Sequence, residues 1–211
     1  MGNKCKLKQF EEYRSFDHTF EKDCTLKGKW KEHFKNENPI VLELACGKGD
    51  YAIGLANLYP NKNFIGIDIK GNRMWRGANT VEEKGILNVA FLRAHIDHIM
   101  DYFTEDEVDE IWITFPDPQP KKERKRLTSK MFLDRYKPIL KSSGTINLKC
   151  DSELMYEYTL QMIEENKLTL LINKPDVYIE ENVSQEMGIK TYYERKWLKE
   201  GREIKYLKFS L

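Results

Sequence analysis

One stretch of the chain places a carboxylate between a buried strand and a dense group of cations. Residues 110–126 read EIWITFPDPQPKKERKR, so Asp117 follows an apolar strand and stands in a proline-rich turn. Each proline of that turn fixes the backbone φ and reduces the entropy that the loop loses on ordering. A rigid carboxylate at the mouth of a strand, followed by cations, indicates chemistry carried out beside a phosphate backbone.

A second stretch, LELACGKGD, has the pattern of a loop that approaches a ligand. Gly47 and Gly49 allow a tight turn and close contact between the backbone and a ligand. Asp68 ends the next predicted strand, where an acidic side chain can accept hydrogen bonds from both hydroxyls of a ribose. The spacing Gly47-x-Gly49-x-x-Ala52 also satisfies the dinucleotide fingerprint. These residues alone therefore leave a nicotinamide enzyme open.

Glu43 distinguishes a nicotinamide cofactor from S-adenosylmethionine. It lies inside the first predicted strand, and a buried carboxylate is costly unless it is paired. The amino group of a methionine moiety, near a sulfonium, offers it a cation directly or through water. A dinucleotide offers a phosphate, which Glu43 would repel, and the chain lacks the separate substrate domain of most dehydrogenases. We therefore predict S-adenosylmethionine in this pocket. The structural alternative for Glu43 is a pair with a lysine or a backbone cap.

The loop after the third predicted strand, 93–97, is expected to meet the adenine. His95 is the favoured residue at the edge or face of the ring, and Asp97 is the second choice. His98 lies three residues after His95, but nothing else completes a set of ligands, so no metal site is expected.

Asp117 follows the fourth predicted strand, where methyl-transfer folds place the group that holds the acceptor. If the acceptor is N7 of guanine, it carries a lone pair and no proton, so attack on a methyl group needs no general base. The site must then supply alignment and tolerance of a cationic product. A carboxylate can accept from the N–H groups of guanine and offset the new charge. The alternative is that Asp117 only caps the turn.

The cations that follow are dense for an ordinary helix face: Lys121, Lys122, Arg124, Lys125 and Arg126. We interpret them as a phosphate-binding run, which predicts steep salt dependence of binding. The alternative is a solvated charge run.

Two later segments are predicted to lie near Asp117, at the carboxyl edge of the sheet. Asp151 ends the fifth predicted strand, which brings it beside Asp117 at the carboxyl edge of the sheet. Residues 191–196, TYYERK, precede the last strand and offer a hydroxyl, aromatic faces and a carboxylate. Such groups suit an extruded base, although the segment taken alone would be interpreted as a polar turn.

The bulk properties fit one α/β domain of 211 residues with a net charge of +1, so attraction for nucleic acid must come from local clustering. Four scattered cysteines, no signal peptide and no apolar run of membrane length predict a cytoplasmic protein with reduced thiols and no membrane partner. Residues 1–39 are predicted to form an N-terminal arm with a helix at 26–34, and residues 40–211 the catalytic domain.

Within that domain the apolar pattern alternates between strands and helices, with a turn at 142–144. This alternation predicts a mostly parallel sheet with helices on both faces. Strands are predicted at 40–45, 64–69, 89–93, 111–115, 144–149, 168–172 and 203–210. Helices are predicted at 51–58, 72–84, 97–103, 129–140 and 153–165.

At these residues the chain resembles the bacterial tRNA (guanine-N7-)-methyltransferase family. The segment FPDPQPKKERKRL is similar to the family's Phe-Pro-Asp-Pro-Trp-Pro-Lys-Lys, TYYERK to its Thr-x-Tyr-Glu-x-Lys, and LKCD to its Leu-Lys-Thr-Asp. The resemblance covers the chain from about residue 40 to its end. It implies a Rossmann-like class I methyltransferase domain with a seven-stranded, mostly parallel sheet and an antiparallel last strand.

The resemblance also implies site residues, with Asp117 the residue most closely tied to catalysis. The implied cofactor contacts are Glu43, Asp68, His95 and Asp117, and the implied guanine contacts are Lys121, Asp151, Thr191, Tyr192, Tyr193 and Glu194. Three positions depart from the family pattern. Ala45 replaces a common Gly, a change that Gly47 and Gly49 should absorb. Gln119 replaces Trp, and His95 stands where an acid is common.

The expected reaction is transfer of a methyl group from S-adenosylmethionine to N7 of a guanine in the variable loop of tRNA. The expected partner is tRNA, bound by a monomer or a homodimer. One alternative is methylation of an exocyclic amine, because the sequence at 117–120 loosely resembles the motif of such enzymes. Another is an RNA-binding module with a vestigial cofactor pocket.

Overall fold

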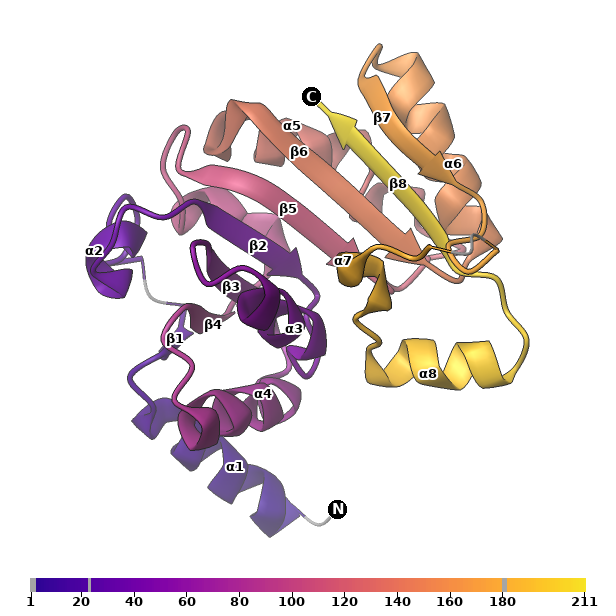
Figure 1. Cartoon of the computed structure of the whole chain (residues 1–211). Helices are drawn as coiled ribbons and strands as arrows, with labels where there is room; N and C mark the ends of the chain where they lie inside the picture. Colours follow the sequence, from indigo (N-terminus) through magenta and orange to yellow (C-terminus); the bar gives the residue numbers. More distant parts are fainter. Residues whose placement is uncertain (1–2, 23, 180–181) are drawn as a thin grey trace.

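The structure is a computed structural model that describes residues 3–22, 24–179 and 182–211. Its centre is a sheet with the strand order β1-β4-β3-β2-β5-β6-β8-β7 (Figure 1). The strands are β1 (Thr19–Glu21), β2 (Ile40–Leu44), β3 (Asn63–Asp68), β4 (Val89–Arg93), β5 (Val108–Thr114), β6 (Leu140–Cys150), β7 (Thr169–Lys174) and β8 (Lys205–Ser210).

The strand directions confirm the predicted sheet. The pairs from β1 to β6 are all parallel, while β8 runs antiparallel to both β6 and β7. The central strand β2 is buried at every position, as expected for a parallel strand covered on both faces. All seven predicted strands are present. An eighth, β1, comes from the segment predicted as an arm and pairs with β4, Phe20 opposite Leu92.

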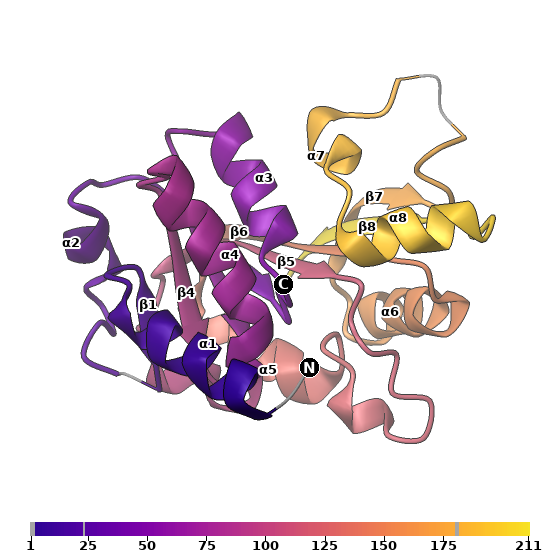
Figure 2. The same cartoon turned by 90° about the horizontal axis from the view of Figure 1, so that it is seen from below.

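Helices cover both faces of the sheet, as predicted (Figures 1 and 2). On one face α1, α3, α4 and α7 pack around Tyr51, Met74 and Phe91, and on the other α2, α5 and α6 pack around Trp30 and Tyr136. The helices are α1 (Asn3–Ser15), α2 (Trp30–Phe34), α3 (Asp50–Leu58), α4 (Gly71–Lys84), α5 (Lys130–Ile139), α6 (Glu153–Glu165), α7 (Gln185–Gly188) and α8 (Tyr192–Lys199), with 3-10 turns η1 (Ile96–Asp101) and η2 (Glu123–Lys125).

Two local predictions were wrong, and one segment has a structure that its pattern taken alone did not indicate. The turn expected at 142–144 lies inside β6, where the chain bulges: Leu140 pairs with Val108 but Thr145 already pairs with Glu110. The helix expected at 26–34 begins only at Trp30. Residues 192–199, whose start reads as a polar turn, form helix α8. The division into an arm at 1–39 and a catalytic domain at 40–211 stays a prediction.

Candidate active site

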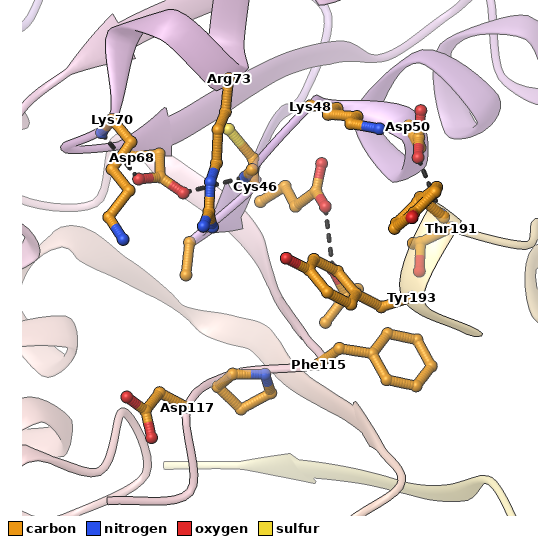
Figure 3. A pocket seen from close by; sticks show the side chains of 16 residues that line it. Cys46, Lys48, Asp50, Asp68, Lys70, Arg73, Phe115, Asp117, Thr191 and Tyr193 are labelled. Carbon is orange, nitrogen blue, oxygen red and sulfur yellow. Dashed lines mark hydrogen bonds between the residues drawn. The ribbon is translucent and has the colours of Figure 1, made fainter. Parts of the chain in front are cut away.

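The carboxyl ends of β2, β3 and β5 open onto a cavity of about 310 Å³, termed the main cavity (Figure 3). It brings together side chains from four parts of the chain: the loop after β2, the segment from the end of β3 into α4, the loop after β5 and the start of α8. Of the predicted site residues, those that line it are Glu43, Gly47, Asp68, Asp117, Thr191, Tyr192 and Tyr193.

The loop between β2 and α3 forms one side of the main cavity. Gly47 and Gly49 have φ of 56° and 72°, the left-handed region that favours glycine. A Cβ on Gly49 would lie 2.4 Å from the ring of Phe91, whereas one on Gly47 would meet nothing within 4 Å. Gly47 therefore leaves open space beside the backbone. Ala45 itself has φ of 57°, so its neighbours do not absorb the departure from glycine.

Asp68 holds this loop in place. One carboxylate oxygen accepts a hydrogen bond from the backbone N–H of Gly47 and the other from that of Lys70, both at 2.9 Å. The side chain is buried at the end of β3 and still lines the main cavity. Its remaining lone pairs are compatible with the predicted contact to ribose hydroxyls.

Glu43 is buried and capped by protein donors. One oxygen accepts from the N–H of Ala52, in the first turn of α3, and the other from the hydroxyl of Thr114, both at 2.8 Å. The backbone-cap alternative therefore holds, and the residue lines the cavity as well. Burial raises the pKa of this carboxyl to about 8, although the two hydrogen bonds act to lower it. A cation placed beside it would lower that pKa and favour the charged form.

His95 opens onto a second cavity of about 350 Å³, which shares Ala45 and Asp68 with the first. His95 is exposed at the start of η1. Asp97 lines the same cavity, but it is already paired with Lys125 at 2.8 Å and Arg135 at 3.6 Å. The hydrogen bond from Lys125 is the main reason that the pKa of Asp97 is lowered.

Asp117 is exposed in the loop after β5, across the main cavity from Asp68 (Figure 3). One of its oxygens accepts from the N–H of Gln119 at 3.1 Å, so the turn-capping alternative is also realised. Phe115 and Gln119, on either side, have φ of 49° and 45°. Strained non-glycine conformations of this kind cluster at functional sites.

The start of α8 forms the remaining wall of the main cavity. Thr191 caps the helix, and Tyr192 and Tyr193 are 51% and 43% exposed at its first turn. The N–H of Tyr192 donates to Asp50 at 2.9 Å, and the ammonium of Lys48 lies 4.0 Å from the centre of the Tyr192 ring. Two aromatic faces therefore stand at the rim.

The structure does not bring four of the predicted residues to either cavity: Gly49, Lys121, Asp151 and Glu194. Asp151 forms an ion pair with Arg202 at 2.7 Å. Glu194 is fully buried and pairs with Lys149, also at 2.7 Å. Burial lowers the pKa of Lys149, and the Glu194 carboxylate opposes that shift.

The basic run contains one buried arginine beside exposed cations, which corrects the interpretation of 121–126 as a phosphate-binding run throughout. Arg126 is only 2% exposed; it donates to the carbonyl of Pro118 at 3.0 Å and lies 4.3 Å from the centre of the Tyr158 ring. It anchors the loop instead of meeting phosphate. Lys125 is paired with Asp97, while Lys121, Lys122 and Arg124 remain exposed.

Several residues of the main cavity were not singled out from the sequence. They are Cys46, Lys48, Asp50, Lys70, Arg73, Thr114, Phe115 and Pro116. Lys48 and Asp50 could have been found because they belong to the glycine loop, and Lys70 and Arg73 because they follow the strand that Asp68 ends. Thr114 could not, because its contact with Glu43 depends on the pairing of β2 with β5. The described residues contain no group of three metal-ligating side chains, and none of their helices has the length and apolar character of a membrane span.

A mostly parallel sheet with an antiparallel last strand and a cavity at its carboxyl edge is the fold of class I methyltransferases. The solved structure of 16S rRNA methyltransferase KamB has this fold, with a TM-score of 0.68 over 87% of this chain and 93% of that one, at 14% identity. A family model described as "Putative methyltransferase" matches residues 37–207.

Two curated relatives identify the family more closely. The tRNA (guanine-N(7)-)-methyltransferase of Bacteroides fragilis is 51% identical over 99% of this chain and 86% of its own length. That of Christiangramia forsetii is 48% identical, with 100% of both chains covered. The chain belongs to the bacterial tRNA (guanine-N7-)-methyltransferase family, which confirms the resemblance that its motifs carry.

Proposed function

We propose that the protein transfers a methyl group from S-adenosylmethionine to N7 of a guanine in tRNA, in the variable loop as the family implies. The observation that carries the proposal is that Glu43, Asp68 and Asp117, from three different strand ends, open onto one cavity. A sulfonium donor and a purine can therefore be held against each other in a single space. The assignment to the cytoplasm and a monomeric or dimeric state stay predictions.

The residues of the cavity fit the proposed methyl donor. Burial raises the pKa of the Glu43 carboxyl, and the amino group of a methionine moiety would supply a cation that favours its charged form. Asp68 stands where a ribose is held in folds of this type. Gly47 keeps the backbone open between them. When bound, S-adenosylmethionine would supply a methyl group activated on a sulfonium.

Asp117 and the α8 wall are proposed to hold the acceptor base. The free oxygen of Asp117 can accept from the N–H groups of guanine and offset the positive charge that develops on the ring. Tyr192 and Tyr193 offer faces on which an extruded base can stack, and Thr191 offers a hydroxyl. Because N7 carries no proton, these residues need only orient the base and stabilise its charge.

Exposed cations flank the main cavity on two sides. Lys121, Lys122 and Arg124 lie on the loop that carries Asp117. On the other side, α8 and the residue before its N-cap carry Lys190, Arg195, Lys196 and Lys199, all at least partly exposed. We infer that the phosphate backbone around the target nucleotide runs between these two groups, with Lys121 in the first of them.

The test is to incubate the protein with unmodified tRNA and methyl-labelled S-adenosylmethionine, and then to cleave the product chemically at N7-methylguanine. The expected result is strand scission at one guanine of the variable loop. Label on an exocyclic amine would replace the proposal with the alternative enzyme. Calorimetry that detects no S-adenosylmethionine binding would favour the RNA-binding module.

A further inference from the structure

Lys149 on β6 and Glu194 on α8 form a buried ion pair beneath the α8 wall. Both side chains are 0% exposed, and the ammonium lies 2.7 Å from Oε1 of Glu194. The same ammonium donates to the carbonyl oxygens of Met187 at 2.9 Å and Ile189 at 3.2 Å. The hydroxyl of Tyr178 donates to Oε1 of Glu194 at 2.6 Å. One lysine thus joins the sheet to α7, to α8 and to the loop between them.

The second oxygen of Glu194 connects this pair to the cavity. Oε2 accepts from the backbone N–H of Thr191 at 3.4 Å, while the hydroxyl of Thr191 accepts from the N–H of Glu194 at 3.1 Å. This reciprocal capping box fixes the first turn of α8. Thr191, Tyr192 and Tyr193 are the residues of that turn that line the main cavity.

Stability alone does not account for such a pair. Two charges removed from water lose solvation that their mutual attraction barely restores, and apolar replacements of buried pairs are often equally stable. A pair that also fixes the direction of a helix start, however, sets where the side chains of that helix point. In this chain those side chains form the wall of the main cavity at the start of α8.

We propose that Lys149 and Glu194 are positioning residues, which hold residues 191–193 at the distance from β6 that methyl transfer requires. This inference rests on the proposed function. It replaces direct guanine contact by Glu194 with an indirect role, because the carboxylate is enclosed and its oxygens are occupied. A shift of the wall by about 1 Å is enough to lower turnover on the order of a hundredfold.

The experiment compares Glu194→Gln, Lys149→Met and the double variant with both substitutions. Each single variant leaves a polar group without its partner, so its Tm falls together with its turnover. The double variant removes both charges, so its Tm recovers toward that of the wild type. Its kcat on tRNA nevertheless stays about a hundredfold low, because the link from β6 to α8 is missing. Its Kd for S-adenosylmethionine changes by less than about threefold, since Glu43 and Asp68 are intact.

Thr159→Val is the matched control. It breaks two buried hydrogen bonds, each 2.7 Å long, to the Thr128 hydroxyl and to the carbonyl of Met155, on the opposite face of the sheet. This variant is expected to lower Tm without changing kcat. Tyr178→Phe covers the case in which the charge variants do not fold, because it keeps the ring and removes only the hydroxyl, which donates to Glu194 and lies 3.2 Å from the carbonyl oxygen of Met187. About a tenfold loss of kcat is expected.

A double variant with restored Tm and wild-type kcat overturns the inference, as does Tyr178→Phe with wild-type kcat. The test of the ion pair can be distinguished from the test of the proposed function. If the wild type places its label on an atom other than N7, the proposed function fails, while the rates of the variants on the actual acceptor still decide the role of the pair.

Discussion

Two buried glutamates lie behind two different walls of the main cavity, and their partners differ. Glu43 has only neutral donors, Ala52 N–H and the Thr114 hydroxyl, and its pKa is raised to about 8. Glu194 has the ammonium of Lys149 at 2.7 Å. The first carboxyl is left ready for a cation that arrives with a ligand, and the second is already neutralised by the protein. Burial and residue type are the same, so under the proposed roles the partner is what separates a binding carboxyl from a positioning one.

The largest expected effect is that of replacing Asp117, the proposed contact to the acceptor base. Asp117→Ala removes the exposed carboxylate of the loop after β5, and we expect kcat to fall by about 10³-fold because the charge on guanine loses its nearest counter-charge. The Kd for S-adenosylmethionine, measured by calorimetry, should change little because Glu43 and Asp68 remain. A loss of cofactor affinity as large as the loss of kcat would place Asp117 on the donor side instead.

The comparison itself is sharpened by changing each glutamate to glutamine. Glu43→Gln should weaken S-adenosylmethionine binding by about 10- to 100-fold, because the ligand's cation loses its counter-charge. Glu194→Gln should leave that Kd within about threefold. Calorimetric titration of both variants decides the matter, and equal reductions in affinity would remove the distinction between the two walls.

The positive charge on the loop after β5 should affect the binding of tRNA and not the binding of the cofactor. Lys121→Gln with Lys122→Gln is expected to weaken tRNA binding severalfold at low salt. The slope of log K against log salt should fall by about one for each phosphate that the variant no longer neutralises. Lys137→Gln, at an exposed position of α5, is the control. A wild-type slope in the double variant would show that these lysines face solvent in the complex.

The smallest expected effect is the release of a proton from Glu43 when the cofactor binds. Glu43 has a folded pKa of about 8 against an ordinary value of 4.5, so it holds a proton at neutral pH that the unfolded chain has released. Its contribution to stability is present below pH 4.5 and is lost as pH rises through 8. A bound cation lowers the pKa of Glu43, so cofactor binding at pH 7 should release up to about one proton from the wild type. Glu43→Gln should release none, as judged by calorimetry in buffers of different ionisation enthalpy.

The sequence predicted the parts of the site that depend on local pattern. Gly47, Gly49 and Asp68 follow apolar strands, and the ends of parallel strands meet at one edge of a sheet. The strand β1 was missed because it has three half-buried residues and no alternation that a pattern can detect. Helix α8 carried a signal, since Thr191 and Glu194 have the spacing of a capping box.

Other roles depend on partners that are remote in sequence. Arg126 looks like its basic neighbours until Tyr158 and the carbonyl of Pro118 are placed around it. Asp151 pairs with Arg202, which lies beyond both β7 and α8 along the chain. Glu194 meets Lys149 only because β8 brings its segment back to β6. No spacing rule predicts contacts of this kind.

The anchor at Arg126 has a consequence for how quickly tRNA is captured. The Arg126 side chain, supported by the Tyr158 face, ties together the two ends of the segment 118–126. The backbone that carries the lysines is therefore held before any nucleic acid arrives, and complex formation does not have to order it. Preorganisation of this kind lowers the entropic penalty of association and favours rapid, electrostatically guided encounter.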